Sequence, residues 1–128
     1  MAPPVSETRL KQIATDACEA ALRSAEGYVH SSTPSWNSAI INSILNSLVS
    51  ETSVDGSPPK FKYVVNSTII QLQAPPAGDP EAKAAKRGLH SAQGAFWNND
   101  VDGNWGFQYH GAESKGIDVV IQVLWVGV

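Results

Sequence analysis

The sequence predicts an α+β fold in which two N-terminal helices pack on a four-stranded antiparallel sheet. Apolar residues recur at helical spacing as far as residue 51, and after the prolines at 58 and 59 the apolar period changes to two. The helical and strand-like segments do not alternate along the chain, which argues against a parallel sheet. At 128 residues, we expect a single domain over residues 1–128.

Both helices are marked by an apolar stripe and by end signals. The first is expected over residues 5–26, with Gly27 as a stop. In the second, Thr33 can cap free backbone N–H groups, and Pro34 suits the first helical position because its missing N–H has no partner there. This helix should fade near Glu51. Its apolar stripe comprises Trp36, Ile40, Ile44 and Leu48, widened by Ile41 and Leu45.

Four strands are expected after the helices. The run FKYVVNSTIIQLQ, residues 61–73, is rich in β-branched and aromatic residues. A shorter strand is predicted at 91–98, an alternating one at 105–109, and an almost continuously apolar one at 117–126. The loop insertion at 74–89 has two open interpretations, a very short helix or a mobile loop, because its turn and cap residues accompany no apolar stripe.

The stretch WNNDVDGNW fits two local structures. Asn98, Asp100 and Asp102 match the first ligand positions of an EF-hand calcium loop, but Tyr109 stands where that loop needs a bidentate glutamate. A β-hairpin explains the stretch better, because Asp102 and Gly103 favour a turn. Two side chains at the turn, those of Asp100 and Asp102, are expected to be solvated. A two-residue turn would place Phe96 opposite Tyr109 and Trp97 opposite Gln108.

Several classes of protein are disfavoured by composition and motif. A net charge of −3 without a basic patch does not indicate nucleic-acid binding. The longest apolar run, residues 117–128, is too short to insert across a membrane. The N-terminus lacks the pattern of a signal peptide, so the protein is expected to be cytosolic. The only cysteine, Cys18, excludes an internal disulfide and suits a small buried position.

The chain carries no recognisable catalytic motif, and we expect neither an enzyme nor a cofactor or metal site. It lacks a glycine-rich phosphate loop, a GxSxG turn and a CxxC pair. Its three histidines are scattered at loops or strand ends, where surface or capping roles are common: His30, His90 and His110.

Both faces of the last strand are apolar, which predicts an interface. Two helices can cover one face of the sheet, so the opposite face should be polar. Large side chains occupy it instead, and a two-fold homodimer that buries roughly 800 Å² per partner would cover them. The predicted dimer-interface residues are Val120, Leu124 and Val126. The edge strands of such a sheet can also accept an extended peptide.

Four segments together resemble the Tctex-type dynein light chains: Trp36 to Leu48, FKYVVNSTIIQ, AFWNNDVDGNW and the apolar C-terminal strand. The resemblance implies a noncatalytic homodimer with paired or exchanged strands, located in the cytoplasm on the cytoskeleton. It also implies β-strand addition of the dynein intermediate chain and of cargo peptides, in minus-end-directed transport on microtubules. A dynein-independent scaffold of the same fold is the alternative. Carried over by position, the peptide-binding residues are Phe61, Tyr63, Gln93, Gly94, Ala95, Phe96 and Trp97.

Two departures from the resemblance concern the loop and the hairpin. The insertion at 74–89 is longer than is usual in these light chains, so it can alter the neighbourhood of the second strand. Asn98 stands where the family often has Asp, which weakens any cap made by a carboxylate there.

Overall fold

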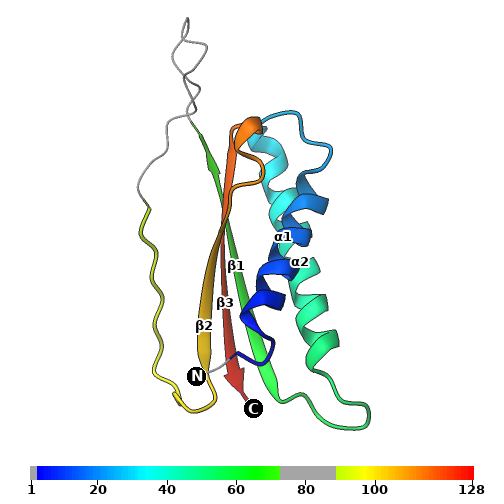
Figure 1. Ribbon diagram of the computed structural model, residues 1–128, viewed down its shortest axis with the longest axis vertical. Coiled ribbons are helices and arrows are strands. Elements are labelled where there is room, and N and C mark those ends of the chain that lie inside the picture. The colour runs from blue at the N-terminus through cyan, green and yellow to red at the C-terminus, as the bar shows by residue number, and fades with distance from the viewer. Residues whose placement is uncertain (1–2, 73–88) are drawn as a thin grey trace, which may run out of the picture.

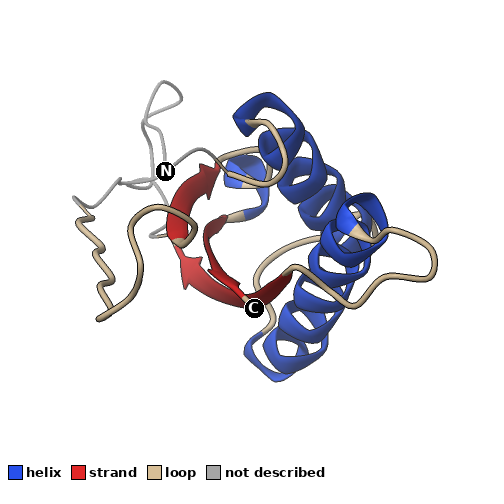
Figure 2. Ribbon diagram, turned by 90° about the horizontal axis from the view of Figure 1, so that it is seen from below, coloured by secondary structure: helices blue, strands red, loops and turns tan. Residues whose placement is uncertain are grey.

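The computed structural model describes residues 3–72 and 89–128. In the described part of the chain, two α-helices form one layer and a three-stranded sheet forms the other. Both helices lie on the same face of the sheet (Figures 1 and 2). Short 3-10 helices, η1 (His30–Ser32) and η2 (Glu113–Lys115), precede α2 and β3. The main elements are α1 (Glu7–Leu22), α2 (Thr33–Thr52), β1 (Phe61–Gln71), β2 (Gly103–Tyr109) and β3 (Ile117–Gly127).

The helices pack through the stripes that the sequence predicts. Ser6 caps α1 by accepting a hydrogen bond from the Arg9 N–H. From the first turn of α1, the Arg9 guanidinium reaches across to α2 and donates to both carboxylate oxygens of Glu51, at 2.7 and 3.1 Å. The inward face of α1 is formed by Leu10, Ile13, Ala14, Ala17, Cys18 and Leu22, and that of α2 by Ile40, Ile44 and Leu48.

The strand order is β1-β3-β2, and both pairs are antiparallel. The last strand of the chain is therefore the centre of the sheet, and β1 and β2 are its edges among the described residues. Alternate residues of β3 are fully buried against the helices, which makes β3 the spine of the core. They are Ile117, Val119, Ile121, Val123 and Trp125.

The N-terminus of α2 differs from the prediction by one residue. Ser32 is the residue that precedes the helix, and Thr33 is its first residue. The Thr33 hydroxyl donates to the His30 carbonyl oxygen at 2.7 Å, so it provides a hydrogen bond to a backbone carbonyl of η1 instead of capping the N–H groups of α2. Pro34 does lie in the first turn, as expected.

The predicted hairpin pairing is wrong within this chain. Residues 91–98 form no strand, and β2 pairs with β3 alone among the described strands. Gly103 is not a turn residue, because it has no positive φ and begins β2. A Cβ at that position would lie 2.5 Å from Cζ2 of Trp125, so close packing explains this glycine. The predicted insertion at 74–89 lies outside the described residues except for Leu89.

Candidate binding surfaces and a side-chain cluster

An extended arm, residues 89–97, precedes β2. In Figure 1 it runs alongside β2 but apart from it, on the side of the sheet away from the helices. A hydrogen bond from Gln122 Nε2 to Ser91 Oγ at 2.7 Å connects it to the sheet. The Phe96 side chain is fully exposed, which is unusual for a large aromatic residue. Of the other arm residues predicted to bind peptide, Gly94 and Ala95 are exposed, and Gln93 and Trp97 are half-buried.

The arm ends in an ordered turn that is built around Asp102. This carboxylate is 6% exposed, so the prediction that it is solvated is wrong. Its Oδ2 accepts from the Asn98 backbone N–H at 2.8 Å, and its Oδ1 accepts from the Gly127 N–H at 2.6 Å. Because both oxygens already accept backbone hydrogen bonds, Asp102 is not arranged as a calcium ligand. Asp100 is exposed, as expected.

The outer edge of β2 pairs with no strand in the described part of the chain. Hydrogen bonding alternates along antiparallel strands, and the register pairs Trp105 with Val123 of β3. Every second residue of β2 therefore directs its backbone N–H and C=O groups away from β3. Such an edge is a template for another strand.

The opposite edge of the sheet carries a groove. Its volume is about 650 Å³, and it lies between the C-terminal half of α2 and the start of β1. Phe61 and Tyr63, both predicted peptide contacts, line it together with Val49. The Tyr63 hydroxyl donates to Thr52 Oγ1 at 2.8 Å, and burial raises the pKa of this tyrosine. Since β3 separates β1 from β2, the structure does not bring Phe61 and Tyr63 together with the arm.

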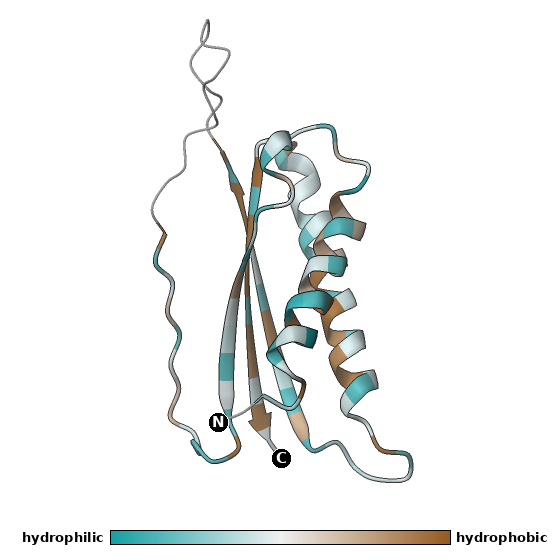
Figure 3. Ribbon diagram, in the orientation of Figure 1, coloured by the Kyte–Doolittle hydropathy of each residue, from teal (hydrophilic) through white to brown (hydrophobic). Residues whose placement is uncertain are grey.

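The sheet face opposite the helices is partly apolar. Val120, Leu124 and Val126, the predicted interface residues, are only half-buried there, and Val64 of β1 is 54% exposed beside Leu124. Figure 3 shows hydrophobic stretches along β1 and β3 as well as along the helices. This open face thus retains apolar surface that neither helix covers.

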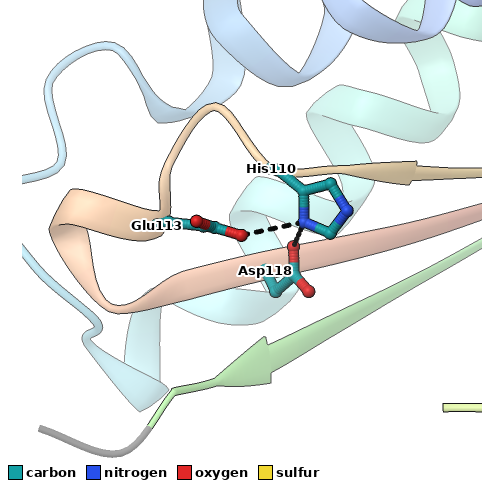
Figure 4. Close-up of side chains that lie close together, drawn as sticks. All are labelled: His110, Glu113 and Asp118. Atoms are coloured by element: carbon teal, nitrogen blue, oxygen red, sulfur yellow. Dashed lines mark ion pairs between the residues drawn. The ribbon is translucent and has the colours of Figure 1, made fainter. Parts of the chain in front are cut away.

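A cluster of titratable side chains lies at the β2–β3 connection. His110 follows β2, Glu113 belongs to η2 and Asp118 is the second residue of β3. Figure 4 shows the two carboxylates converging on one ring nitrogen of His110. His110 Nδ1 lies 3.0 Å from Glu113 Oε1 and 3.1 Å from Asp118 Oδ1.

Sequence reasoning missed this cluster because it considered the histidines singly. The i, i+3 spacing of His110 and Glu113 was visible in the sequence. The approach of Asp118 depends on the turn between the strands, where Gly116 adopts a φ of 75°. Short-range pattern does not reveal that approach.

Cys18 is fully buried in the core between α1 and the sheet. Burial, with a smaller contribution from the charge of Glu19, raises the pKa of its thiol to about 12. A protonated, inaccessible thiol is a poor nucleophile, and the position fits the small buried residue expected from the sequence.

Together, the helical layer, the free strand edges and the open apolar face define a small α+β module that offers surfaces for binding other chains. The Tctex-1 family model matches residues 4–126, and the chain belongs to that family. It is similar to a protein named "Dynein light chain Tctex-type" from Schizosaccharomyces pombe, with 30% identity over 128 residues and the full length of both chains. It is also similar to a protein of the same name from Drosophila melanogaster, with 25% identity over 101 residues, 79% of this chain and 72% of that one. Within the described residues, no helix is long and apolar enough to cross a membrane.

Proposed function

We propose that this protein is a noncatalytic light chain of cytoplasmic dynein that acts as a homodimer and binds the dynein intermediate chain by β-strand addition. Family membership supports the association with dynein. The observation that carries the binding mode is the arm, which is extended and pairs with no described strand, while the neighbouring edge of β2 also has no partner among the described residues.

The arm and the free edge suit an exchange of strands between two copies. If the arm of one copy pairs with β2 of the other, it becomes the fourth strand of that sheet, and the exposed Phe96 gains a surface to pack on. The apolar open face, with Val120, Leu124 and Val126, would then meet its counterpart in the same dimer.

An exchanged arm has one edge on β2 and a second edge that remains free. An intermediate-chain segment would add to that second edge, and residues 93–97 would contact it. A dimer would present two such sites, so that a bivalent intermediate chain would bind more tightly than one site allows. Cargo peptides of similar conformation would use the same edge, which would place the protein on microtubules in minus-end-directed transport.

The experiment is an isothermal titration with an N-terminal intermediate-chain segment from the same organism, in EDTA and again with calcium. We expect saturable binding of one peptide per subunit that calcium does not change. Ala95→Pro removes a backbone donor from the arm and should abolish the binding. Val49→Glu, at a half-exposed position in the β1 groove, is the matched variant and should bind normally.

Other results would assign the peptide to a different site, or the protein to a different function. If Val49→Glu abolishes binding while Ala95→Pro does not, the peptide occupies the groove beside Phe61 and Tyr63. If the wild-type protein gives no heat at high micromolar concentration, the function is the alternative one, a dynein-independent scaffold for other extended peptides.

A further inference from the structure

We propose that His110, Glu113 and Asp118 form a binding site for a divalent transition-metal ion, with Zn²⁺ as the ion that suits these ligands. Among the residues that the structure describes, they are the group whose potential ligand atoms converge, all within 4.8 Å of one another. His110 directly follows β2, Glu113 lies in η2 and Asp118 lies in β3 (Figure 4).

The spacing of the ligand atoms suits zinc. At bond lengths of about 2.0–2.2 Å, two ligands of a tetrahedral zinc ion lie roughly 3.3–3.5 Å apart. His110 Nδ1 lies 3.0 Å from Glu113 Oε1 and 3.1 Å from Asp118 Oδ1. Movements of a few tenths of an ångström would therefore open the cluster around an ion.

The buried carboxylate of Asp118 is a second observation that points to a ligand at this cluster. Its side chain is 8% exposed, and its Oδ1 is fully buried and accepts no hydrogen bond from any described residue, so that its polar contact is the ion pair with His110 Nδ1 at 3.1 Å. A buried carboxylate oxygen without a hydrogen bond is costly. The oxygen is directed toward His110 Nδ1, where a metal ion would complete its coordination.

The second oxygen of Asp118 is held in place by Gln108. Gln108 Nε2 donates to Asp118 Oδ2 at 2.6 Å, so the carboxylate presents Oδ1 to the cluster in a fixed orientation. Outer partners of this kind orient metal ligands and raise metal affinity. Gln108 lies on β2 and Asp118 on β3, which makes the outer partner part of the sheet itself.

The donor set selects the kind of ion. One imidazole nitrogen and two carboxylate oxygens suit borderline ions such as Zn²⁺, whereas Ca²⁺ and Mg²⁺ prefer oxygen alone. Three protein ligands leave one tetrahedral position for water, and His110 is half-exposed, so water can reach it. All three ligands belong to one chain, and the site does not depend on the proposed dimer or on dynein. A bound ion would clamp the β2–β3 connection.

The test is a calorimetric titration with ZnCl₂ of the full chain, from which metal has first been removed with a chelator. The absorption of Co²⁺, as a spectroscopic substitute, reports the coordination geometry. We expect one ion per chain and a tetrahedral Co²⁺ spectrum, with no heat from CaCl₂. His110→Gln and Glu113→Gln should each raise the Kd at least tenfold. Gln108→Leu, which removes only the outer partner, should raise it about tenfold. His90→Gln, at an exposed histidine outside the cluster, should bind as the wild type does.

The Gln variants guard against loss of folding, since His110 and Glu113 lie outside the buried core. Circular dichroism of each variant checks this directly. The proposal is overturned if ZnCl₂ at 1 mM gives no saturable binding to the wild-type chain. It is equally overturned if His110→Gln and Glu113→Gln bind as the wild type does, or if the cluster responds to protons but not to metal, which would make it an ion pair only.

Discussion

The carboxylate of Asp102, the residue before β2, accepts a hydrogen bond from the backbone N–H of Gly127, at the end of β3. The same carboxylate holds the Asn98 N–H, so one buried side chain joins the end of the sheet to the turn that closes the arm. The arm is therefore anchored at a fixed point even though it pairs with none of the described strands of its own chain. A fixed starting point is what an arm needs if it is to reach a second copy in a defined direction.

Removing this carboxylate should cost stability. Asp102→Ala leaves the N–H groups of Asn98 and Gly127 without partners, and hydrogen bonds to a charged group contribute about 1.5–3 kcal/mol each. We expect the free energy of unfolding to fall by about 3 kcal/mol in urea denaturation. Asp100→Ala changes an exposed carboxylate two residues away and should stay within about 0.5 kcal/mol of the wild type. Equal losses in the two variants would contradict the assigned role.

Two apolar residues of α2, Ile44 and Trp36, should differ in their contribution to the stability of the fold. Ile44 is 1% exposed, and Ile44→Ala should lower the free energy of unfolding by about 2–5 kcal/mol. Trp36 was expected in the core from its place in the stripe, but it is half-buried at the edge. Trp36→Ala should therefore lower the free energy of unfolding by less than the roughly 3–5 kcal/mol that truncating a buried tryptophan costs. Urea denaturation of both variants measures the difference, and a larger loss for Trp36→Ala would place that residue in the core.

Local patterns predicted the features that depend on local spacing. The helix stripes, the strand at β1 and the buried face of β3 follow from periods of 3.6 and 2, and the structure confirms them. The segment at 91–98 has a strand-like composition but pairs with no described strand, although the outer edge of β2 has no described partner. Composition does not say whether the edge that a strand pairs with belongs to its own chain.

The features that the sequence did not predict depend on distant partners. Asp102 looked like a solvated turn residue because its partner, Gly127, lies 25 residues away. The approach of Asp118 to His110 likewise depends on how β3 returns beside β2. Neither relationship leaves a periodic signal.

The buried thiol should make stability fall in alkali. The pKa of Cys18 is raised to about 12 in the folded chain, against an ordinary value of about 8.5. Between these two pH values the unfolded chain releases the thiol proton and the folded chain keeps it. The contribution of the thiol to the free energy of unfolding is therefore complete at lower pH and is lost as the pH rises. Relative to Cys18→Ala, the wild type should lose about 1.4 kcal/mol per pH unit above pH 9. Burial also raises the pKa of Tyr63, which remains in the variant and cancels in the comparison. The pKa of Tyr109 is raised by burial and, to a smaller extent, by the charges of Glu19 and Cys18, so the part due to Cys18 belongs to the measured difference.

Urea denaturation at several pH values between 8 and 11 gives the two stability curves. Parallel curves would show that the Cys18 thiol does not stay protonated in the folded state.

The open face of the sheet provides the test of the proposed dimer. Leu124 lies on β3 at the centre of that face, half-buried in the single chain. If a second copy covers it, Leu124→Glu places a carboxylate in an apolar contact without a partner, which is costly enough to separate the subunits. Sedimentation equilibrium should then give a monomer mass for the variant and a dimer mass for the wild type. Val29→Glu changes an apolar residue that is 48% exposed and lies between α1 and η1, away from this face, and it should remain dimeric. If Leu124→Glu stays dimeric, the open face is not part of the interface. The dimer would then be held by the arm and the β2 edge alone, because the strand exchange does not itself require the open face to be covered.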